Sequence, residues 1–364
     1  MKLAVLGVGL VGGSIGLAAK ARGLGSEVAG FDPDDATLDR ALELGALDVA
    51  ASGVADAVSG ADLVFCAAPV NSLPGLVAEA LAATDDGTGV SDVGSTKLGI
   101  AEAVAGLEAA SRFIGGHPLA GAETAGVEHS RPDLFEGARW FLTPTERSEG
   151  VIFDRLHNFV ADLGARPQAI DAAEHDRAMA TISHLPHVLA NVLASRAADT
   201  LAAGERRPEV GRSFRDTTRV AGANPSIWGD IFAANAGAIA DEVDAVIEKL
   251  EQASSTLRAG DAGQLSAWQS AAAADRHALL DVGHPGGELF ELRLGVENRP
   301  GVVAEIALAL GRAGVNIEDM SLAPSSEQRS GAISLWIAGP EEAVRAGAIV
   351  SELGHSVSTV SGGS

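Results

Sequence analysis

A chain of 364 residues is too long for one ordinary hydrophobic core, so its length predicts two or three domains. Its 49 acidic residues outnumber its 26 basic residues and give a formal net charge of −23, which argues against a nucleic-acid groove or an anionic membrane surface. The single cysteine, Cys66, excludes an internal disulfide, and no apolar run is long enough for a membrane span. We therefore expect a soluble, cytoplasmic protein in which any basic residues gathered at one place bind an anion.

The first 32 residues have the order strand, glycine turn, helix, strand and acid. Residues 2–6 form an apolar run suited to a buried parallel strand, and Gly7, Gly9 and Gly12 follow it in a GxGxxG pattern that opens a helix. Gly7 permits a tight turn, Gly9 leaves room for a pyrophosphate, and Gly12 lets the helix pack closely on the strand. The free N–H groups at the helix N-terminus suit phosphates. The pattern predicts a dinucleotide-binding site.

A second strand, at residues 27–31, ends in Asp32, whose carboxylate suits a ribose 2′-hydroxyl. A GxGxxG pattern alone can serve a close helix contact, but strand, helix and acid together favour the cofactor. Asp32 would repel the 2′-phosphate of NADP, and no arginine occurs in residues 31–35, so we expect NAD. A secretory signal peptide is a poor alternative, because the glycines weaken its helix and cleavage would separate Asp32 from the turn.

Further strand and helix units follow along the chain. We expect these elements in order: a helix at 34–44, strands at 63–67 and 89–92, a strand at 139–142, a helix at 150–163 and a strand at 166–170. Their alternation predicts a doubly wound α/β domain, in which ligands bind beyond the C-terminal ends of the strands. Pro69, Ser95 and His117 lie in segments that follow such ends. Ser95 is also a candidate N-cap for a helix that starts near Lys97.

After Asp171 the chain becomes alanine-rich and helical, with no strand pattern. Three long helical stretches are expected, at 172–203, 225–259 and 261–281. The first carries His175, His184 and His187, the last two on one face. The absence of an HExxH motif and of paired cysteines argues against a metal site and favours core or substrate-facing histidines. Residues 212–225 concentrate three arginines, Arg219 among them, which indicates either a solvated loop or a carboxylate clamp.

The last part of the chain begins with a loop at residues 284–287. The elements expected beyond it are a strand at 288–296, a turn at 298–301, a helix at 302–313, strands at 316–322 and 331–338, and a helix at 341–354. Their order is βαββα, with a possible last strand at residues 355–360.

Five motifs resemble those of the prephenate and arogenate dehydrogenases of tyrosine biosynthesis. They are GVGLVGGS at 7–14, DVGSTK at 92–97, GGHPLAGAE at 115–123, SHLPH at 183–187, and DTTR at 216–219 followed by Trp228. The C-terminal βαββα unit resembles an ACT domain, a small regulatory module that binds amino acids. The resemblance implies a Rossmann domain at 1–170, an all-α substrate and dimerisation domain at 171–283, and a small α+β ACT-like domain at 284–364.

The resemblance further implies NAD-dependent oxidative decarboxylation of prephenate to 4-hydroxyphenylpyruvate. His117 would take the proton of the ring hydroxyl while Ser95 steadies that hydroxyl, and Arg219 would bind the ring carboxylate. The chemistry of the reaction is consistent with these roles. Oxidising a secondary alcohol requires a base of near-neutral pKa, and loss of CO₂ then makes the ring aromatic. The remaining site residues that it implies are Glu123, His184 and His187 for the substrate, and Gly7, Gly9, Leu10, Val11, Gly12, Asp32 and Pro69 for the cofactor.

The substrate and the regulation leave alternatives open. Position 122 is Ala, where relatives can carry a side chain that hydrogen-bonds substrate, so arogenate is an alternative to prephenate; a chargeable His187 favours the more anionic prephenate. The ACT-like unit is expected to bind tyrosine where Asn298, Pro300 and Gly301 meet the following helix. Its alternative role is only to strengthen a homodimer.

Two alternatives belong to other functional classes. A sensor of NAD or amino acids could keep this fold without turnover, but the presence of both His117 and Arg219 argues against that. A β-hydroxyacid or imine dehydrogenase would have a catalytic lysine in its helical domain, and no lysine occurs there before Lys249.

Overall fold

The computed structural model describes residues 1–120, 124–202, 210–281, 289–297, 299, 302–324 and 330–360. The chain divides into two compact units, 1–250 and 251–364, which are described separately below. The first unit contains the expected dinucleotide-binding domain and most of the expected helical domain. The domain boundaries proposed after residues 170 and 283 stay a prediction.

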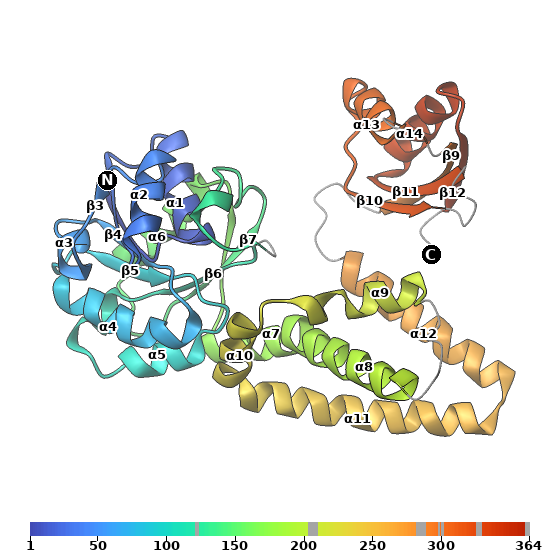
Figure 1. Ribbon diagram of the computed structural model, residues 1–364, viewed down its shortest axis with the longest axis horizontal. Helices are drawn as coiled ribbons and strands as arrows, with labels where there is room; N and C mark the ends of the chain where they lie inside the picture. Colours follow the sequence, from blue (N-terminus) through green and yellow to red (C-terminus); the bar gives the residue numbers. More distant parts are fainter. Residues whose placement is uncertain are drawn as a thin grey trace. The chain divides into compact units, whose positions relative to one another are not determined.

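The first unit is built on a parallel sheet (Figure 1). Its strand order is β3-β2-β1-β4-β5. Helices connect successive strands and cover both faces, which confirms the doubly wound α/β prediction. Strands β1 and β4 are apolar and almost wholly buried, as expected for a parallel sheet covered on both faces. The five strands are β1 (Lys2–Leu6), β2 (Glu27–Phe31), β3 (Val49–Ala50), β4 (Leu63–Cys66) and β5 (Gly89–Asp92).

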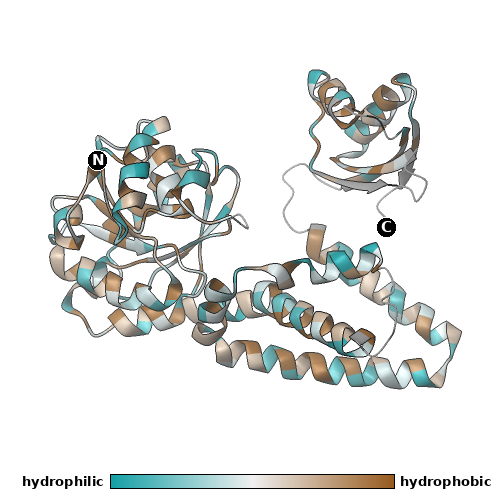
Figure 2. Ribbon diagram, viewed as in Figure 1, coloured by the Kyte–Doolittle hydropathy of each residue, from teal (hydrophilic) through white to brown (hydrophobic). Residues whose placement is uncertain are grey.

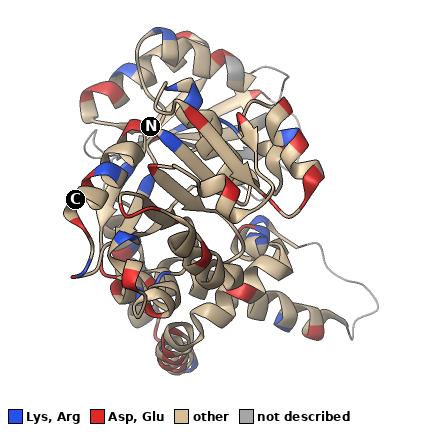
Figure 3. Ribbon diagram, turned by 90° about the vertical axis from the view of Figure 1, so that its left-hand side faces the viewer, with Lys and Arg blue, Asp and Glu red and all other residues tan. Residues whose placement is uncertain are grey.

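Two hydrophobic clusters lie on the two faces of this sheet. One contains side chains from α1 (Leu10–Ala21), α2 (Asp35–Glu43) and α6 (Gly150–Asp162). The other contains side chains from α3 (Val54–Val58), α4 (Leu73–Ala83) and α5 (Leu98–Val104). Figure 3 shows charged residues mainly on the surrounding helices, while most of each strand is uncharged. Within the described residues, no helix is both long and apolar enough to cross a membrane.

A second, three-stranded sheet carries the segment around His117. It has the order β6-β7-β8, with β6 (Gly115–Pro118) antiparallel to β7 (Arg139–Thr143) and β7 parallel to β8 (Arg166–Ala169). The sequence predicted β7 and β8 but treated residues 115–118 as a segment that follows a strand. They form a strand themselves, and the pairing places His117 opposite Phe141.

Helices follow β8 in the first unit. The long helix expected at residues 225–259 is instead two helices that meet at Asn235. The stretch expected at 172–203 contains a π-helical turn at Ala180–His184. The helices are α7 (Ala172–Met179), α8 (Leu185–Ala202), α9 (Arg212–Thr218), a short 3-10 helix (Arg219–Gly222), α10 (Pro225–Ala234) and α11 (Ala236–Ala259), whose last residues belong to the second unit.

The second unit contains an antiparallel sheet with the strand order β10-β11-β9-β12. Its core side chains come from the sheet and from α13 and α14, which lie on one face of the sheet (Figure 1). The predicted βαββα order is confirmed, and the possible last strand is present. The elements are α12 (Ala262–Asp281), β9 (Leu289–Glu297), α13 (Val302–Arg312), β10 (Asp319–Pro324), β11 (Ser330–Ala338), α14 (Pro340–Glu352) and β12 (Ser356–Val360).

Candidate active site

The glycine turn between β1 and α1 packs directly against neighbouring backbone atoms. Gly7 has a φ of +92°, and a Cβ there would lie 2.5 Å from the carbonyl oxygen of Ala67. A Cβ at Gly12 would lie 2.0 Å from the carbonyl oxygen of Gly7, so neither position accepts a side chain. A Cβ at Gly9, by contrast, would meet nothing within 4 Å. The turn therefore packs tightly on the sheet and leaves open space at Gly9, as a pyrophosphate at the N-terminus of α1 requires.

Asp32 lies at the end of β2 and holds this turn. Its carboxylate accepts a hydrogen bond from the backbone N–H of Val8 at 2.8 Å and from that of Asp34 at 3.1 Å. Leu10 and Val11 pack at the start of α1 against the neighbouring core, and Pro69 is exposed just beyond β4. The described geometry fits a dinucleotide, with Asp32 placed where the ribose of the cofactor is expected.

A cavity of about 250 Å³ contains three of the predicted site residues. Ser95 enters from the loop after β5, His117 from β6, and His184 from the end of the π-helical turn. Apolar side chains form most of the remaining wall. The full lining is Ser95, His117, Leu119, Met179, Ile182, Ser183, His184, Trp228 and Ile231.

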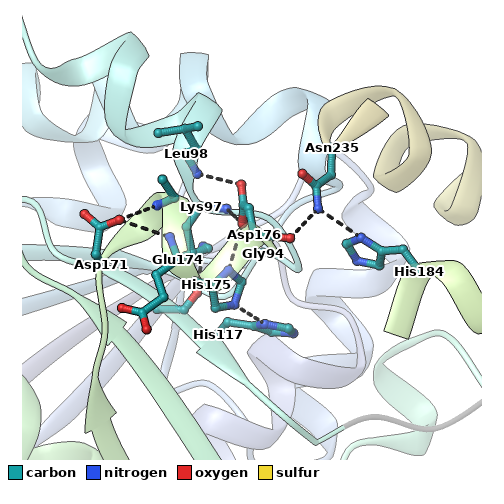
Figure 4. A network of polar contacts seen from close by, with 12 residues as sticks. Gly94, Lys97, Leu98, His117, Asp171, Glu174, His175, Asp176, His184 and Asn235 are labelled. Carbon is teal, nitrogen blue, oxygen red and sulfur yellow. Dashed lines mark hydrogen bonds and ion pairs between the residues drawn. The ribbon is translucent and has the colours of Figure 1, made fainter. Parts of the chain in front are cut away.

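His117 is connected to a buried histidine and a buried aspartate (Figure 4). Its Nδ1 lies 2.8 Å from Nε2 of His175, and Nδ1 of His175 lies 2.8 Å from Oδ1 of Asp176. A carboxylate only accepts, so Nδ1 of His175 carries a proton, and the Nε2 of a neutral His175 then accepts the Nδ1–H of His117. This arrangement leaves the lone pair of His117 on Nε2, free to accept a proton.

Asp176 also fixes the start of α5. Its two carboxylate oxygens accept hydrogen bonds from the backbone N–H groups of Lys97 at 2.8 Å and of Leu98 at 2.9 Å. The N-cap position of α5 is Lys97, with no capping side chain from its own segment. The expectation that Ser95 caps this helix is therefore wrong, because a carboxylate from α7 satisfies the free N–H groups instead. Ser95 is therefore not used as a helix cap, and it lines the cavity.

A buried ion pair holds the backbone beside His117. The side chains of Lys97 and Asp92 are both 0% exposed and are paired, and Nζ of Lys97 also donates to the carbonyl oxygen of Gly116 at 2.7 Å. Asp92 accepts in turn from the backbone N–H of Gly116 at 3.2 Å. Burial lowers the pKa of Lys97, while the charge of Asp92 opposes that shift. The pair ties the end of β5 to β6 and so fixes the position of His117.

The surroundings of His117 favour its neutral form. One edge of the ring reaches the cavity, but protein surrounds the rest, and this burial lowers the pKa of His117 well below 6.5. Positive charge at His175, Lys97 and His184 would lower that pKa further. An imidazole that is neutral at neutral pH can act as a general base.

His184 and His187 both contact Trp228 but line different cavities. The rings of His184 and Trp228 meet edge to face with centroids 6.0 Å apart, whereas His187 stacks on Trp228 with centroids 3.3 Å apart. His187 donates through Nδ1 to the carbonyl oxygen of Ser183 at 3.0 Å. It lines a second cavity of about 230 Å³ together with Asn191.

The described residues do not place Arg219 in the wall of the His117 cavity. Arg219 is exposed at the start of its short 3-10 helix, and it is not among the described residues that line the His117 cavity. Its charge contributes, after burial, to a lowered pKa of His187, so these two groups lie near each other. Glu123 lies outside the described residues.

Sequence reasoning predicted His175 only as a core or substrate-facing histidine, and it assigned no role to Asp176 or Asn235. A signal for the first two was present, because the buried positions of α7 are Ala172, His175, Asp176 and Met179, which have the spacing of a core-facing helical stripe. Adjacent titratable residues at the centre of such a stripe require buried partners. No comparable signal marks Asn235.

The sequence matches three family models: prephenate dehydrogenase, nucleotide-binding domain, over residues 15–168; prephenate dehydrogenase, dimerization domain, over 171–270; and ACT domain over 290–349. The prephenate dehydrogenase of Bacillus subtilis is 30% identical over 346 residues, which cover 93% of each chain. The chain belongs to the prephenate dehydrogenase family. The resemblance inferred from the motifs and the ACT domain are both confirmed.

Two solved structures of this family resemble the chain. A prephenate dehydrogenase from Aquifex aeolicus, in complex with hydroxyphenyl propionate and NAD⁺, is 26% identical with a TM-score of 0.70, covering 77% of this chain and 98% of that one. A Synechocystis arogenate dehydrogenase is 27% identical with a TM-score of 0.66, covering 77% of this chain and 100% of that one.

The predicted effector residues Asn298, Pro300 and Gly301 lie outside the described residues. Between them, Arg299 pairs with Glu305 of α13. The ACT domain is established by the match, and its ligand remains a prediction.

Proposed function

We propose that this chain catalyses the NAD-dependent oxidative decarboxylation of prephenate to 4-hydroxyphenylpyruvate. The observation that carries the proposal is His117, which lines a cavity with Ser95 and has its Nδ1 hydrogen-bonded to a buried His175–Asp176 pair. The family relatives named prephenate dehydrogenase support this substrate. A nicotinamide bound at the glycine turn would accept the hydride from the carbinol carbon.

His117 would remove the hydroxyl proton while the hydroxyl carbon is oxidised. Ser95 lines the same cavity and would hold the hydroxyl oxygen by a hydrogen bond. Once that carbon is a ketone, the bond between the ring and its carboxylate breaks. The bonding electrons enter the ring and the ketone takes up a proton as the phenol, so CO₂ leaves and the ring becomes aromatic. The driving force of the second step thus comes from the substrate itself.

Asp32 supports NAD as the cofactor rather than NADP. Its carboxylate is held at the end of β2 by the N–H groups of Val8 and Asp34, where a 2′-phosphate would be repelled. Neither backbone donor supplies the positive charge that would offset this repulsion.

Arogenate is the alternative substrate, since a family neighbour is an arogenate dehydrogenase. The two substrates differ by a keto or an amino group on the side chain. The positive charge of Arg219 near His187 favours the more anionic prephenate, whereas burial and that same charge lower the pKa of His187, so His187 itself adds no argument from charge. A non-catalytic sensor of NAD or amino acids is a less favoured alternative, because it would not require the His117 hydrogen-bond network.

Turnover of prephenate with NAD⁺, followed at the absorbance of the reduced nicotinamide, tests the proposal. Arogenate and NADP⁺ complete a grid of four assays on one preparation. We expect prephenate with NAD⁺ to give the highest kcat/KM. Faster turnover of arogenate would show that arogenate, not prephenate, is the substrate. No turnover in any of the four assays would favour a non-catalytic sensor.

The helical domain supports a homodimer. Its match is to a dimerization domain, and hydrophobic residues recur along α8 and α11 (Figure 2). Some of their apolar side chains are exposed, including Val192 at 60% and Leu250 at 60%. Such exposed apolar surface is typical of an interface. Sedimentation equilibrium should give twice the chain mass; a single chain at micromolar concentration would contradict the proposal.

The ACT domain is proposed to bind an aromatic amino acid, tyrosine above all, and to lower activity when it does. The alternative is that it only strengthens dimerisation. Gly301→Val and a truncation after Gly283 separate these roles when tyrosine binding and inhibition are measured at saturating substrate. Loss of inhibition in both active variants supports the proposal, whereas equal inhibition of both active variants would show that the ACT domain is not the sensor and would leave it the role of strengthening the dimer.

A further inference from the structure

Asn235 is a buried polar residue that joins two parts of the site. It lies between α10 and α11, and 7% of its surface is exposed. Its side-chain nitrogen Nδ2 donates to the backbone carbonyl oxygen of Asp176 at 2.8 Å. The same nitrogen lies 3.2 Å from Nδ1 of His184 (Figure 4).

These two contacts determine the orientation of the amide and the position of the His184 proton. A backbone carbonyl only accepts, so the NH₂ end of Asn235 must face Asp176. The second hydrogen of that NH₂ points to Nδ1 of His184, which must then accept. A charged imidazole carries a proton on both nitrogens, so His184 is neutral and its proton is on Nε2. In agreement, burial lowers the pKa of His184 to about 4.

We propose that Asn235 is a positioning residue, which fixes His184 as a neutral Nε2–H donor to an acceptor oxygen of the bound substrate. The proposal deepens the function proposed above and rests on it for the identity of that substrate. His184 and His117 line the same cavity with opposite tautomers. His117 has its lone pair on Nε2 and accepts, whereas His184 has its hydrogen on Nε2 and donates.

Neutrality at His184 preserves the basicity of His117. Positive charge on His184 would lower the pKa of His117 further, because the two rings interact electrostatically. Besides His117, the titratable groups that act on His184 are Asp176, His175 and His187, and of these only Asp176 favours its charged form. Asn235 occupies the Nδ1 atom of His184 with a donor and so opposes protonation there.

Nitrogen NMR of the ligand-free protein tests the tautomer directly. Protein labelled with ¹⁵N in its histidines gives long-range proton–nitrogen correlations that separate protonated from unprotonated ring nitrogens. His184→Gln identifies the His184 signals by their loss. We expect a proton on Nε2 and none on Nδ1; a proton on Nδ1 overturns the proposal. This measurement uses no substrate, so failure of prephenate and arogenate turnover would refute the proposed function and leave the tautomer decided.

Asn235→Leu tests the positioning role with little change of size and without adding a charge. Its side chain cannot donate to Nδ1 of His184, so the Nε2–H form is no longer selected and KM for prephenate should rise about tenfold or more. His184→Gln supplies an amide N–H near the place of Nε2 that does not depend on a ring proton. In that background Asn235→Leu should change KM by less than about threefold. Equal increases in both backgrounds would show a purely structural role and overturn the proposal.

Discussion

Nδ1 of His117 and Nε2 of His175 lie 2.8 Å apart, so one ring nitrogen of the expected base is hydrogen-bonded to a second, fully buried imidazole. Asp176 orients His175 from the other side and also holds the first N–H groups of α5. The position of His117 therefore depends on α7, a helix that begins much later in the chain, at Ala172.

Replacing His175 should separate hydrogen bonding from packing at this contact. In His175→Gln, a side-chain oxygen near the place of Nε2 can still accept from His117, so kcat should fall only severalfold. His175→Met fills the space but leaves the Nδ1–H of His117 unpaired, at a cost of about 1–3 kcal/mol, so kcat should fall about 10- to 100-fold. Steady-state kinetics with NAD⁺ binding as the folding control make the comparison. Equal losses in the two variants would show that the hydrogen bond is unimportant.

The pH dependence of kcat/KM should reflect the lowered pKa of His117. Burial holds that pKa well below 6.5, so the base stays unprotonated as the pH falls through 6.5. Activity should be lost only at lower pH. The stability of the fold should also decrease as the pH falls. Below pH 6.5 the unfolded chain binds a proton at His117 that the folded chain does not, and this lowers the free energy of unfolding. An acid limb of kcat/KM at or above pH 6.5 would contradict this account.

Most of the fold was predictable because its signals are local. Residues 2–32 have the glycine spacing and the final acid in one short stretch, and the strands of the ACT domain alternate regularly. The break at Asn235 was not predicted, since alanine-rich sequence continues on both sides and a single asparagine is tolerated in a helix. The strand at residues 115–118 was missed because its pairing partner, β7, begins only at Arg139, well beyond it in the chain.

The site was predictable only in part, for a related reason. The sequence predicted Ser95 and His117 together because both were taken to follow strand ends at the edge where ligands bind; both do line one cavity, although His117 lies within β6 of the second sheet. His175 and Asn235, by contrast, act through partners 58 and 59 residues away in the chain. Contacts of that kind come from the packing of α7 and α10 against the sheet domain. The hydrophobic periodicity of a sequence does not predict which elements pack together.

Arg219→Lys should raise KM for the substrate about tenfold or more. Lysine keeps the charge but loses the two parallel hydrogen bonds that a guanidinium gives a carboxylate, on the order of 1.5–3 kcal/mol. Arg215→Lys, on the exposed α9, is the matched control and should leave KM unchanged. An unchanged KM in Arg219→Lys together with reduced thermal stability would make Arg219 a structural residue.

Asp32→Asn should narrow the preference for NAD⁺ over NADP⁺. The amide oxygen can still accept from the N–H of Val8, so the turn is retained while the negative charge is removed. Asp32→Ser removes the charge and also shortens the side chain, and comparison of the two separates repulsion from loss of the turn. The ratio of kcat/KM for the two cofactors is the measurement; an unchanged ratio in Asp32→Asn would mean that another residue selects the cofactor.

The central claim, that His117 is the base for oxidising the ring hydroxyl of prephenate, is tested most directly by His117→Asn. Asparagine keeps a hydrogen-bonding side chain but cannot take up the proton, so NADH formation from prephenate and NAD⁺ should slow by about 10²- to 10⁴-fold. NAD⁺ binding should stay unchanged, because the glycine turn and Asp32 are untouched. A decrease of less than about threefold in kcat, with prephenate still converted, would remove His117 from the chemistry.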